Sequence, residues 1–304
     1  MRRLLCCAAI GLAGAAFLSL LSGTALAQTT DRAPVIDSAP PHVQYRGGGT
    51  IAGHLEGWAP GDEVSLQRRK SGVWSSITTR PVTDQGRFFF SVDGLRRSGA
   101  FRAIYVEPTS GTEATSDIVR IEVAPRLTFH LSPDKVLQGR TVTAYGRLTP
   151  APGRWVAVQQ RVSGAWRTID TAYQHDGRYA LRFEANRIGA RKLRVVFKGD
   201  QRNSPARSAS PLRVYDPAVA TWYGPGFWGN GTACGQTLRY DTIGVAHRWL
   251  PCGTKVAVLY QGRTIIVPVI DRGPYSHADW DLTQETAERL RFSGTDTIGV
   301  DPVR

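Results

Sequence analysis

Three side chains that can exchange protons lie close together near the end of the sequence: His247, Asp271 and Asp281. Cleavage of a glycosidic bond requires a carboxyl group that keeps its proton until it meets the leaving oxygen, and partial desolvation provides this. Trp222 and Tyr223 lie in the same segment and offer flat rings against which sugar rings can pack. This combination of residue types indicates a protein that binds or cleaves carbohydrate.

Each of these residues also has a purely structural alternative. Asp281 can serve the N-terminus of a helix, and Asp271 can accept backbone N–H groups in an Asp-Arg-Gly-Pro turn. His247 can be a hydrogen-bonded core residue of a strand, and Trp222 and Tyr223 can be core aromatics. A His–Asp–Asp metal site is a further alternative, but the prediction is that the protein uses no metal and no organic cofactor.

The elements that must hold these residues are predicted to be mostly strands. Alternation from Thr254 to Tyr260, a turn at 261–263 and an apolar run from Thr264 to Ile270 predict a hairpin whose second strand is buried. One helix is predicted from Gln284 to about Arg291, with Thr283 as its N-cap.

The N-terminus has the pattern of a cleavable secretory signal. Arg2 and Arg3 precede an apolar run, and Ala25-Leu26-Ala27 has the small residues of a cleavage site. A membrane span is the alternative. The prediction is that residues 1–27 are removed after Ala27, that the mature protein is secreted to the cell wall, and that it has no further contact with a membrane.

Two of the four cysteines, Cys6 and Cys7, lie inside this signal. The remaining pair, Cys234 and Cys252, would then meet an oxidising compartment, where disulfides are common in secreted proteins. Two isolated cysteines are too few for a structural metal site. They are predicted to form a structural disulfide.

The formal net charge of the chain is +13, and removal of Arg2 and Arg3 with the signal leaves +11. A positive surface suits polyanions such as wall polymers. No Lys/Arg-rich run or basic helix concentrates the charge, so a solvated basic surface is the simpler interpretation, and nucleic acid is not an expected partner.

The middle of the sequence contains a repeat. The stretches 71–74 and 163–166, and 84–88 and 175–179, are alike at an offset of 91 or 92 residues. Short alternating stretches separated by turns predict a β-sandwich in each copy, at residues 33–124 and 125–215. The copies resemble bacterial immunoglobulin-like modules. Trp74 and Trp166 are predicted to pack on the sandwiches, with sugar stacking as the alternative.

Residues 218–304 carry five motifs in order. They are Ala220-Thr221-Trp222-Tyr223-Gly224, Thr232-Ala233-Cys234-Gly235, the segment 245–254, Asp271-Arg272-Gly273-Pro274 and Asp281-Leu282-Thr283. In this they resemble the double-psi β-barrel domain of the rare lipoprotein A-like family. The resemblance implies a six-stranded barrel with an open groove that acts on peptidoglycan. Some members are lytic transglycosylases that cleave the MurNAc–GlcNAc bond and leave a 1,6-anhydro product. Expansins, which loosen walls, share the fold.

The resemblance also implies roles for single residues. Asp281 matches the acid that protonates the glycosidic oxygen, and His247 and Asp271 match groove positions. Trp222, Tyr223 and Gln236 would bind substrate. Active members have a Glu and an Asp where this sequence has Gln236 and Arg239, which favours a non-catalytic, expansin-like alternative.

The sequence therefore predicts an all-β protein with two immunoglobulin-like sandwiches, a six-stranded double-psi barrel and one short helix. The leading hypothesis is lytic transglycosylase-like action on peptidoglycan by a monomer. The alternatives are a wall-binding or wall-loosening module and, third, an adhesin in which the sandwiches bind the partner.

Overall fold

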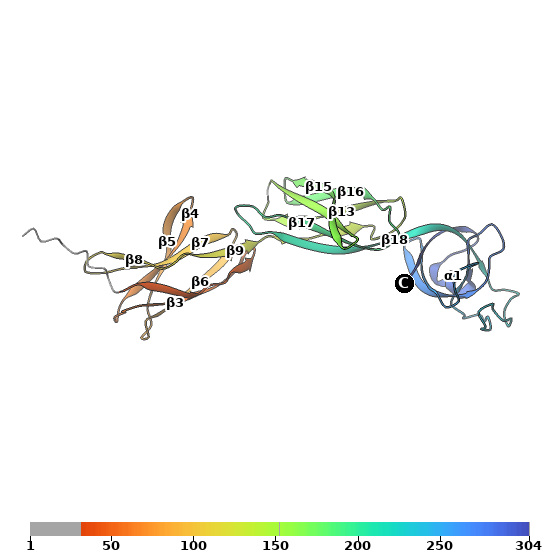
Figure 1. The fold of residues 1–304 in the computed structure, drawn as a ribbon, viewed down its shortest axis with the longest axis horizontal. Helices are drawn as coiled ribbons and strands as arrows, with labels where there is room; N and C mark the ends of the chain where they lie inside the picture. The colour runs from red at the N-terminus through yellow and green to blue at the C-terminus, as the bar shows by residue number, and fades with distance from the viewer. Residues whose placement is uncertain (1–31, 152, 304) are drawn as a thin grey trace, which may run out of the picture.

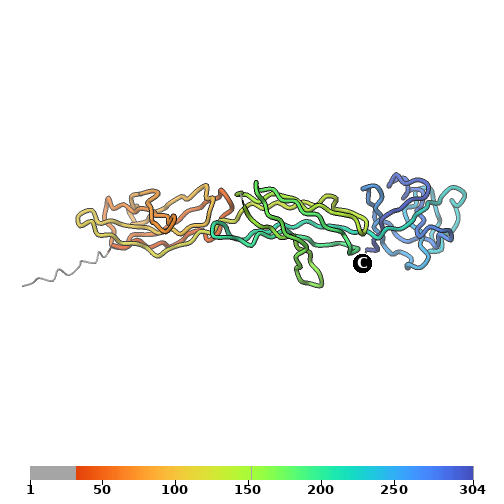
Figure 2. The backbone as a smooth tube through the Cα atoms, turned by 90° about the horizontal axis from the view of Figure 1, so that it is seen from above, coloured from red at the N-terminus to blue at the C-terminus, as the bar shows by residue number. Residues whose placement is uncertain are grey.

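The computed structural model describes residues 32–151 and 153–303. Three β-rich units follow one another along an elongated molecule, as the two perpendicular views show (Figure 1 and Figure 2). The predicted signal, residues 1–27, lies outside the described residues. Within the described ranges, no helix combines the length and the hydropathy needed to span a bilayer.

The first unit has two sheets. One contains β1 (Pro34–Ser38), β3 (Gly47–Leu55) and β6 (Arg87–Leu95). The other contains β2 (His42–Gln44), β9 (Val119–Ala124), β7 (Gly99–Val106), β4 (Glu63–Lys70), β5 (Val73–Pro81) and β8 (Glu113–Thr115). Along β6 buried and exposed residues alternate, so Phe88 and Phe90 enter the core with Leu66 and Tyr105.

The second unit repeats this plan. One sheet contains β10 (Arg126–Leu127), β13 (Thr141–Thr149), β11 (His130–Ser132) and β16 (Arg178–Glu184). The other contains β15 (Ala165–Gln174), β14 (Arg154–Val162), β17 (Gly189–Phe197), β18 (Ala206–Tyr223) and β12 (Lys135–Leu137). The core is separate from that of the first unit and includes Val142, Leu148, Val158 and Leu193.

The strand pairings show the repeat at residue level. Glu63 faces Pro81 in the first unit, and Trp155 faces Tyr173 in the second, an offset of 92 at both positions. Each pair of strands has its register shift at the same place, after Leu66 and after Val158. The two units therefore share strand order and register, and their immunoglobulin-like character stays a prediction.

Trp74 and Trp166 lie at matching places in the two units. Both are half-buried strand residues. The guanidinium of Arg102 lies 4.6 Å from the ring centroid of Trp74, and that of Arg194 lies 4.1 Å from the ring centroid of Trp166. Because an arginine covers a ring face at both sites, the packing role favoured by the sequence describes their surroundings better than sugar stacking.

In the third unit, six strands pair in a closed circuit. In order around it they are β18, β22 (Trp280–Thr283), β19 (Val245–Ala246), β21 (Arg263–Asp271), β20 (Lys255–Tyr260) and β23 (Asp296–Pro302), which pairs again with β18. The core inside includes Val245, Val258, Val267 and Leu282. The closed circuit agrees with a barrel, and its double-psi connectivity stays a prediction.

The predicted hairpin and helix are present, with one correction. β20 and β21 form the hairpin, and α1 (Gln284–Leu290) begins at the N-cap Thr283, whose side chain accepts a hydrogen bond from the Thr286 N–H. The more buried strand is the first, not the second, because Ile266 of β21 is 58% exposed while five of the six residues of β20 are buried. An apolar run by itself does not tell which strand is covered.

β18 joins the second unit to the third without a break. Its first part pairs with β17, and residues 216–220 pair with β23. Pro217 cannot donate a backbone hydrogen bond, yet it remains within the strand, opposite Gly299. The sequence placed the end of the second unit at 215, where the backbone in fact continues as the first strand of the third unit.

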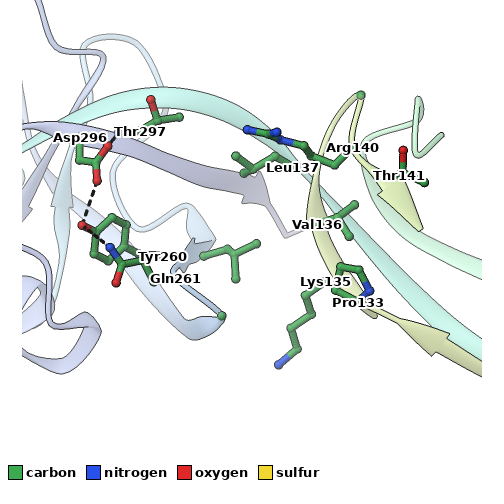
Figure 3. A pocket seen from close by; sticks show the side chains of 13 residues that line it. Pro133, Lys135, Val136, Leu137, Arg140, Thr141, Tyr260, Gln261, Asp296 and Thr297 are labelled. Atoms are coloured by element: carbon green, nitrogen blue, oxygen red, sulfur yellow. Dashed lines mark hydrogen bonds between the residues drawn. The ribbon is translucent and has the colours of Figure 1, made fainter. Parts of the chain in front are cut away.

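Side-chain contacts stabilise this junction between the second and third units. Tyr215, Ala257 and Leu259 form a small apolar cluster with Leu137 packed against it. Arg213 forms an ion pair with Asp301 at 3.5 Å. Beside the cluster, Lys135 and Leu137 face Tyr260 and Asp296 across an open hollow of about 630 Å³ (Figure 3).

The first two units also meet through specific contacts. Asn203, which is 1% exposed, donates to the backbone carbonyls of Arg96 and Val123 in the first unit. The side-chain oxygen of Asn203, Oδ1, accepts a hydrogen bond from the Arg154 guanidinium at 2.8 Å. Buried polar contacts of this kind favour one relative orientation, because any other would leave these groups unpaired.

The β18 junction should depend on Gly299. A Cβ there would lie 2.6 Å from the Tyr215 Cβ and 2.7 Å from a methyl group of Leu137. We expect Gly299→Ala to lower the free energy of unfolding by about 1–3 kcal/mol, measured by chemical denaturation with tryptophan fluorescence. Gly231→Ala is the matched control, because nothing lies within 4 Å of its Cβ position. Equal denaturation midpoints for the two variants would contradict this account of the junction.

Candidate active site

The third unit has a hollow of about 470 Å³ at one end of the barrel strands. Strand residues contribute Trp222 and Tyr223 from β18, Ala246 from β19, Asp271 from β21 and Asp281 from β22. Loop residues complete the wall, among them Phe227, Asn230, Thr232, Arg272 and Tyr275. The hollow therefore contains both predicted aspartates and both predicted aromatics.

Asp281 lies half-buried between two strands. In the parallel pairing of β18 with β22 it stands opposite Thr221, whose hydroxyl donates to Asp281 Oδ1 at 2.8 Å. Burial raises the pKa of Asp281 to about 6, the Thr221 hydrogen bond opposes the rise, and the charge of Asp271 adds to it. Asp281 does not cap α1, because Thr283 does so. A carboxyl of this pKa can donate a proton in mildly acidic or neutral solution.

Tyr223 places a buried hydroxyl near the two carboxyl groups. Among the described residues it makes no hydrogen bond of normal geometry, but it lies near enough to the Asp271 carboxyl to interact with it. Burial raises the pKa of Tyr223 well above its usual value, and the negative charges of Asp271 and Asp281 raise it further. The hydroxyl thus stays protonated and remains available as a donor inside the hollow.

Asp271 is held by the backbone. Its Oδ1 accepts from the N–H groups of Ala233 and Arg272, both at 2.8 Å. This is the turn role that the sequence offered as an alternative, although the residue also lines the hollow. Asp271 therefore fixes the 233 loop to the end of β21 and contributes negative charge beside Asp281.

His247 does not join this set. It follows β19 directly, and because Ala246 lines the hollow, the next side chain projects from the other face of the chain. His247 Nδ1 accepts from the N–H groups of Trp249 and Leu250, and its ring lies 4.3 Å from that of Trp280. Burial and the charges of Arg248 and Arg272 lower its pKa. His247 is therefore held by backbone N–H groups and is not among the residues that line the hollow, and its role in the groove stays a prediction.

Gln236 also lies outside the lining of the hollow. It is exposed in a turn, where its N–H donates to the hydroxyl of Thr232 and its carbonyl accepts from the Thr232 N–H. Only Thr232 of this turn reaches the lining. The substrate-binding role predicted for Gln236 has no support in this position.

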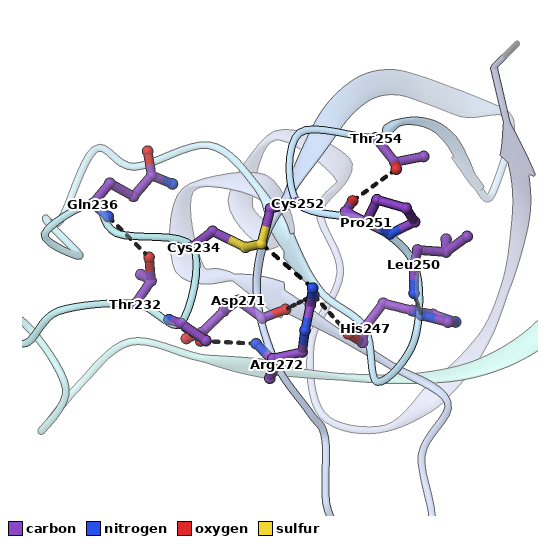
Figure 4. The surroundings of a disulfide bond; sticks show 11 residues. Thr232, Cys234, Gln236, His247, Leu250, Pro251, Cys252, Thr254, Asp271 and Arg272 are labelled. Atoms are coloured by element: carbon purple, nitrogen blue, oxygen red, sulfur yellow. Dashed lines mark hydrogen bonds between the residues drawn. A yellow bond between two sulfur atoms is a disulfide. The ribbon is translucent and has the colours of Figure 1, made fainter.

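The predicted disulfide between Cys234 and Cys252 is present (Figure 4). It ties the 232–236 turn to the loop after β19. Arg272 extends along it, with one guanidinium nitrogen 3.4 Å from Cys252 Sγ and another 3.4 Å from the His247 carbonyl oxygen. The bond thus holds together the loops that border Asp271.

Two aromatic residues of the hollow were not among the site residues predicted from the sequence. Phe227 is 56% exposed and Tyr275 is 86% exposed, and both line it together with Trp222. Large exposed rings at a cavity mark a binding surface. Tyr275 directly follows the turn that contains Asp271, so its position in the sequence could have indicated a place beside the hollow.

Comparison with known proteins agrees with this geometry. Residues 217–304 match the family model described as lytic transglycolase, so the third unit matches this family and the first two units lie outside the match.

Within the described residues, no group of three or more His, Cys, Asp or Glu side chains is arranged to hold a metal ion.

Similar curated proteins include two named peptidoglycan transglycosylases. The chain is 33% identical over 102 residues to the probable endolytic peptidoglycan transglycosylase RlpA of Synechocystis sp., covering 32% of each chain. It is 42% identical over 110 residues to the endolytic peptidoglycan transglycosylase RlpA of Pseudomonas aeruginosa, covering 33% of this chain and 31% of that one. This chain thus spans about a third of the length of these relatives.

Among solved structures, a tetra-tandem repeat from the extending region of a large adhesion protein is similar at a TM-score of 0.30 and 14% identity. The alignment covers 89% of this chain and 66% of that one.

The raised pKa of Asp281 has a consequence for stability. The folded protein holds this proton more tightly than the unfolded chain, so the contribution of Asp281 to stability is complete below about pH 4 and is lost as the pH rises through about 6. Asp281→Asn should therefore raise the free energy of unfolding at pH 7 by about 1–2 kcal/mol, after allowance for solvent screening, and by little below pH 4. Urea denaturation at several pH values measures this.

Thr221→Val tests the same assignment by raising the pKa of Asp281 further. It removes the hydrogen bond that lowers the pKa of Asp281, so the carboxyl should titrate at higher pH in an NMR titration. A stability difference for Asp281→Asn that does not vary with pH would contradict the assignment of the raised pKa.

Proposed function

We propose that this protein is a secreted cell-wall protein whose third unit cleaves peptidoglycan glycan strands by a lytic transglycosylase-like reaction, with Asp281 as the catalytic acid. The observation that carries the proposal is a half-buried carboxyl with a pKa of about 6 inside a hollow lined by aromatic rings. The family match of residues 217–304 and the names of the relatives support the same substrate class.

The reaction needs one acid that later acts as a base. Protonated Asp281 gives its proton to the glycosidic oxygen between MurNAc and GlcNAc, and the bond from the MurNAc C1 to that oxygen breaks. The Asp281 carboxylate then takes the proton of the MurNAc C6 hydroxyl, whose oxygen bonds to C1. The products are a 1,6-anhydro-MurNAc end and a free GlcNAc 4-hydroxyl, and Asp281 recovers its proton. No water is consumed and no cofactor is required.

The neighbours of Asp281 suit both steps. Thr221 holds Oδ1 and so fixes the direction of the carboxyl group. Tyr223 has a buried hydroxyl near the two carboxyl groups, so it can donate to negative charge that develops there. Trp222, Phe227 and Tyr275 provide ring faces for the sugars.

The other segments then have supporting roles. Residues 1–27 direct export and are removed after Ala27, and the units at 33–124 and 125–215, as immunoglobulin-like sandwiches, hold the barrel of residues 218–304 among wall polymers. The contacts of Asn203 and the continuity of β18 support a stiff arm rather than a flexible tether.

The proposal predicts the loss of product when Asp281 loses its acidity. Asp281→Asn should reduce release of anhydro-muropeptides from purified sacculi at least about a hundredfold, measured by mass spectrometry, and binding of the protein to sacculi should remain. In the parent protein, activity should fall as the pH rises above about 6, because the acid must be protonated. Asp279→Asn is the matched control, since that exposed residue accepts only the Val219 N–H in the structure.

Two results would contradict the proposal. One is the absence of anhydro products from the parent protein across the pH range. The other is equal product from the parent and from Asp281→Asn.

A second candidate function is a non-catalytic, expansin-like wall binder. It is favoured by the surroundings of Asp281: Oδ1 of the other carboxyl group of the hollow, Asp271, already accepts from two backbone N–H groups, and Gln236 lies outside the lining. Under this function the protein binds sacculi, weakens them mechanically and releases no anhydro product. The same mass-spectrometric experiment separates the two functions.

Tyr223→Phe tests whether the Tyr223 hydroxyl donates a hydrogen bond during the reaction. The variant removes a buried hydroxyl that makes no hydrogen bond of normal geometry, so the unfolding midpoint should be unchanged or slightly higher. If the hydroxyl donates during the reaction, kcat should fall about tenfold to a hundredfold while KM changes little. An unchanged kcat would remove Tyr223 from the reaction.

A further inference from the structure

An exposed cluster of aromatic rings lies on the second unit, away from the candidate active site in sequence. Trp155 of β14 is 62% exposed and Tyr173 of β15 is 42% exposed, and their ring centroids are 5.2 Å apart. The ring of His175 lies 4.9 Å from that of Tyr173. Neighbouring exposed rings of this size mark an interaction surface.

The first unit shows that the fold does not need these rings. The pairing of Trp155 with Tyr173 corresponds, at the offset of 92, to the pairing of Glu63 with Pro81. In the matching stretches 84–88 and 175–179, His175 corresponds to Asp84. By contrast, the tryptophans at 74 and 166 and the arginines that cover them occur in both units. Residues shared by the two units follow from the common scaffold, whereas the aromatic pair of Trp155 and Tyr173 has no counterpart at the equivalent positions, Glu63 and Pro81, of the first unit.

Trp155 also lines a hollow of about 530 Å³ together with Arg154, Thr171, Lys198 and Asp200. Arg154 is only 7% exposed, and its other nitrogens bind Asp200 at 3.0 Å and Asn203 at 2.8 Å. Its Nη1, however, is buried without a hydrogen-bond partner among the described residues. The Arg154 guanidinium also lies over the ring of Phe197, with its carbon 5.2 Å from the ring centroid, so Arg154 places a buried positive charge in the wall of the hollow.

We propose that Trp155, Tyr173 and the adjoining hollow form a second, non-catalytic binding site for a glycan strand. A polysaccharide matches this surface in two ways: its flat C–H faces can pack on the exposed rings, and its hydroxyl or amide oxygens can accept from the exposed Lys198 ammonium in the hollow. The hollow is lined by charged and hydroxyl side chains as well as by apolar ones, which suits a sugar better than an apolar protein surface.

The site would act together with the barrel. It goes beyond the proposed function but takes the same polymer, the peptidoglycan glycan strand. β18 runs from the sheet that contains Trp155 directly into the barrel, so the two sites keep a fixed relation. A strand bound at the second unit would hold the barrel near wall glycan and raise the effective concentration of its substrate.

The test is co-sedimentation of the full chain with purified sacculi, together with calorimetric titration with glycan strands freed of their peptides. All variants carry Asp281→Asn, which keeps the polymer intact. Trp155→Ala combined with Tyr173→Ala should weaken binding about tenfold. Glu63→Ala combined with Pro81→Ala is the matched control at the equivalent place in the first unit and should leave the affinity unchanged. Both substituted pairs are exposed, and unfolding midpoints check that each variant folds.

The outcomes separate this inference from the proposed function. Equal affinity of the parent and the Trp155/Tyr173 variant, or an equal loss in the control, would overturn the second site. Chains that keep Asp281 are then assayed on short soluble glycan fragments, where the Trp155/Tyr173 variant should release as much anhydro product as the parent. If no chain cleaves but the aromatic variant still loses affinity, the proposed reaction fails and the glycan site stands.

Discussion

The backbone pairing of β18 is the constraint on which the rest of this structure depends. One strand completes the sheet of the second unit, crosses into the third, and pairs there with both β23 and β22. The last residues of the strand, Thr221 to Tyr223, are thereby held opposite Asp281 and its neighbours. A shift of one residue in this register would turn the Thr221 hydroxyl away from Asp281. The orientation of the acid is therefore a consequence of strand pairing that begins outside the barrel.

Within the hollow, the same half-burial that positions Asp281 also sets its chemistry. Removal of water penalises the charged form more than the Thr221 hydrogen bond stabilises it, so the proton is retained to about pH 6. Asp271 adds to this through its charge while its own oxygen is occupied by backbone N–H groups. Two aspartates close in space thus differ in role, because one is bound by the backbone and the other by a single hydroxyl.

The repeat gives a way to separate scaffold from function without any other sequence. The two units keep the same pairings, the same register shift and the same tryptophan–arginine contact at an offset of 92. Where exposed residues at equivalent positions differ, the shared fold does not require either side chain. The exposed aromatic pair of Trp155 and Tyr173 is such a difference, and Trp155 borders a hollow that is also lined by charged side chains.

The sequence alone determined the features that depend on local pattern: the hairpin, the helix with its Thr283 cap, the disulfide, and the presence of Asp271, Asp281, Trp222 and Tyr223 in one segment. Only the tertiary structure decided which side chains share a cavity. His247 and Gln236 fell outside it while Phe227 and Tyr275 came in, since strand direction and loop path, which pairing between distant segments fixes, decide where a side chain points. For the same reason, the continuity of β18 through Pro217 could not be foreseen, because it rests on a partner strand some 80 residues away in sequence.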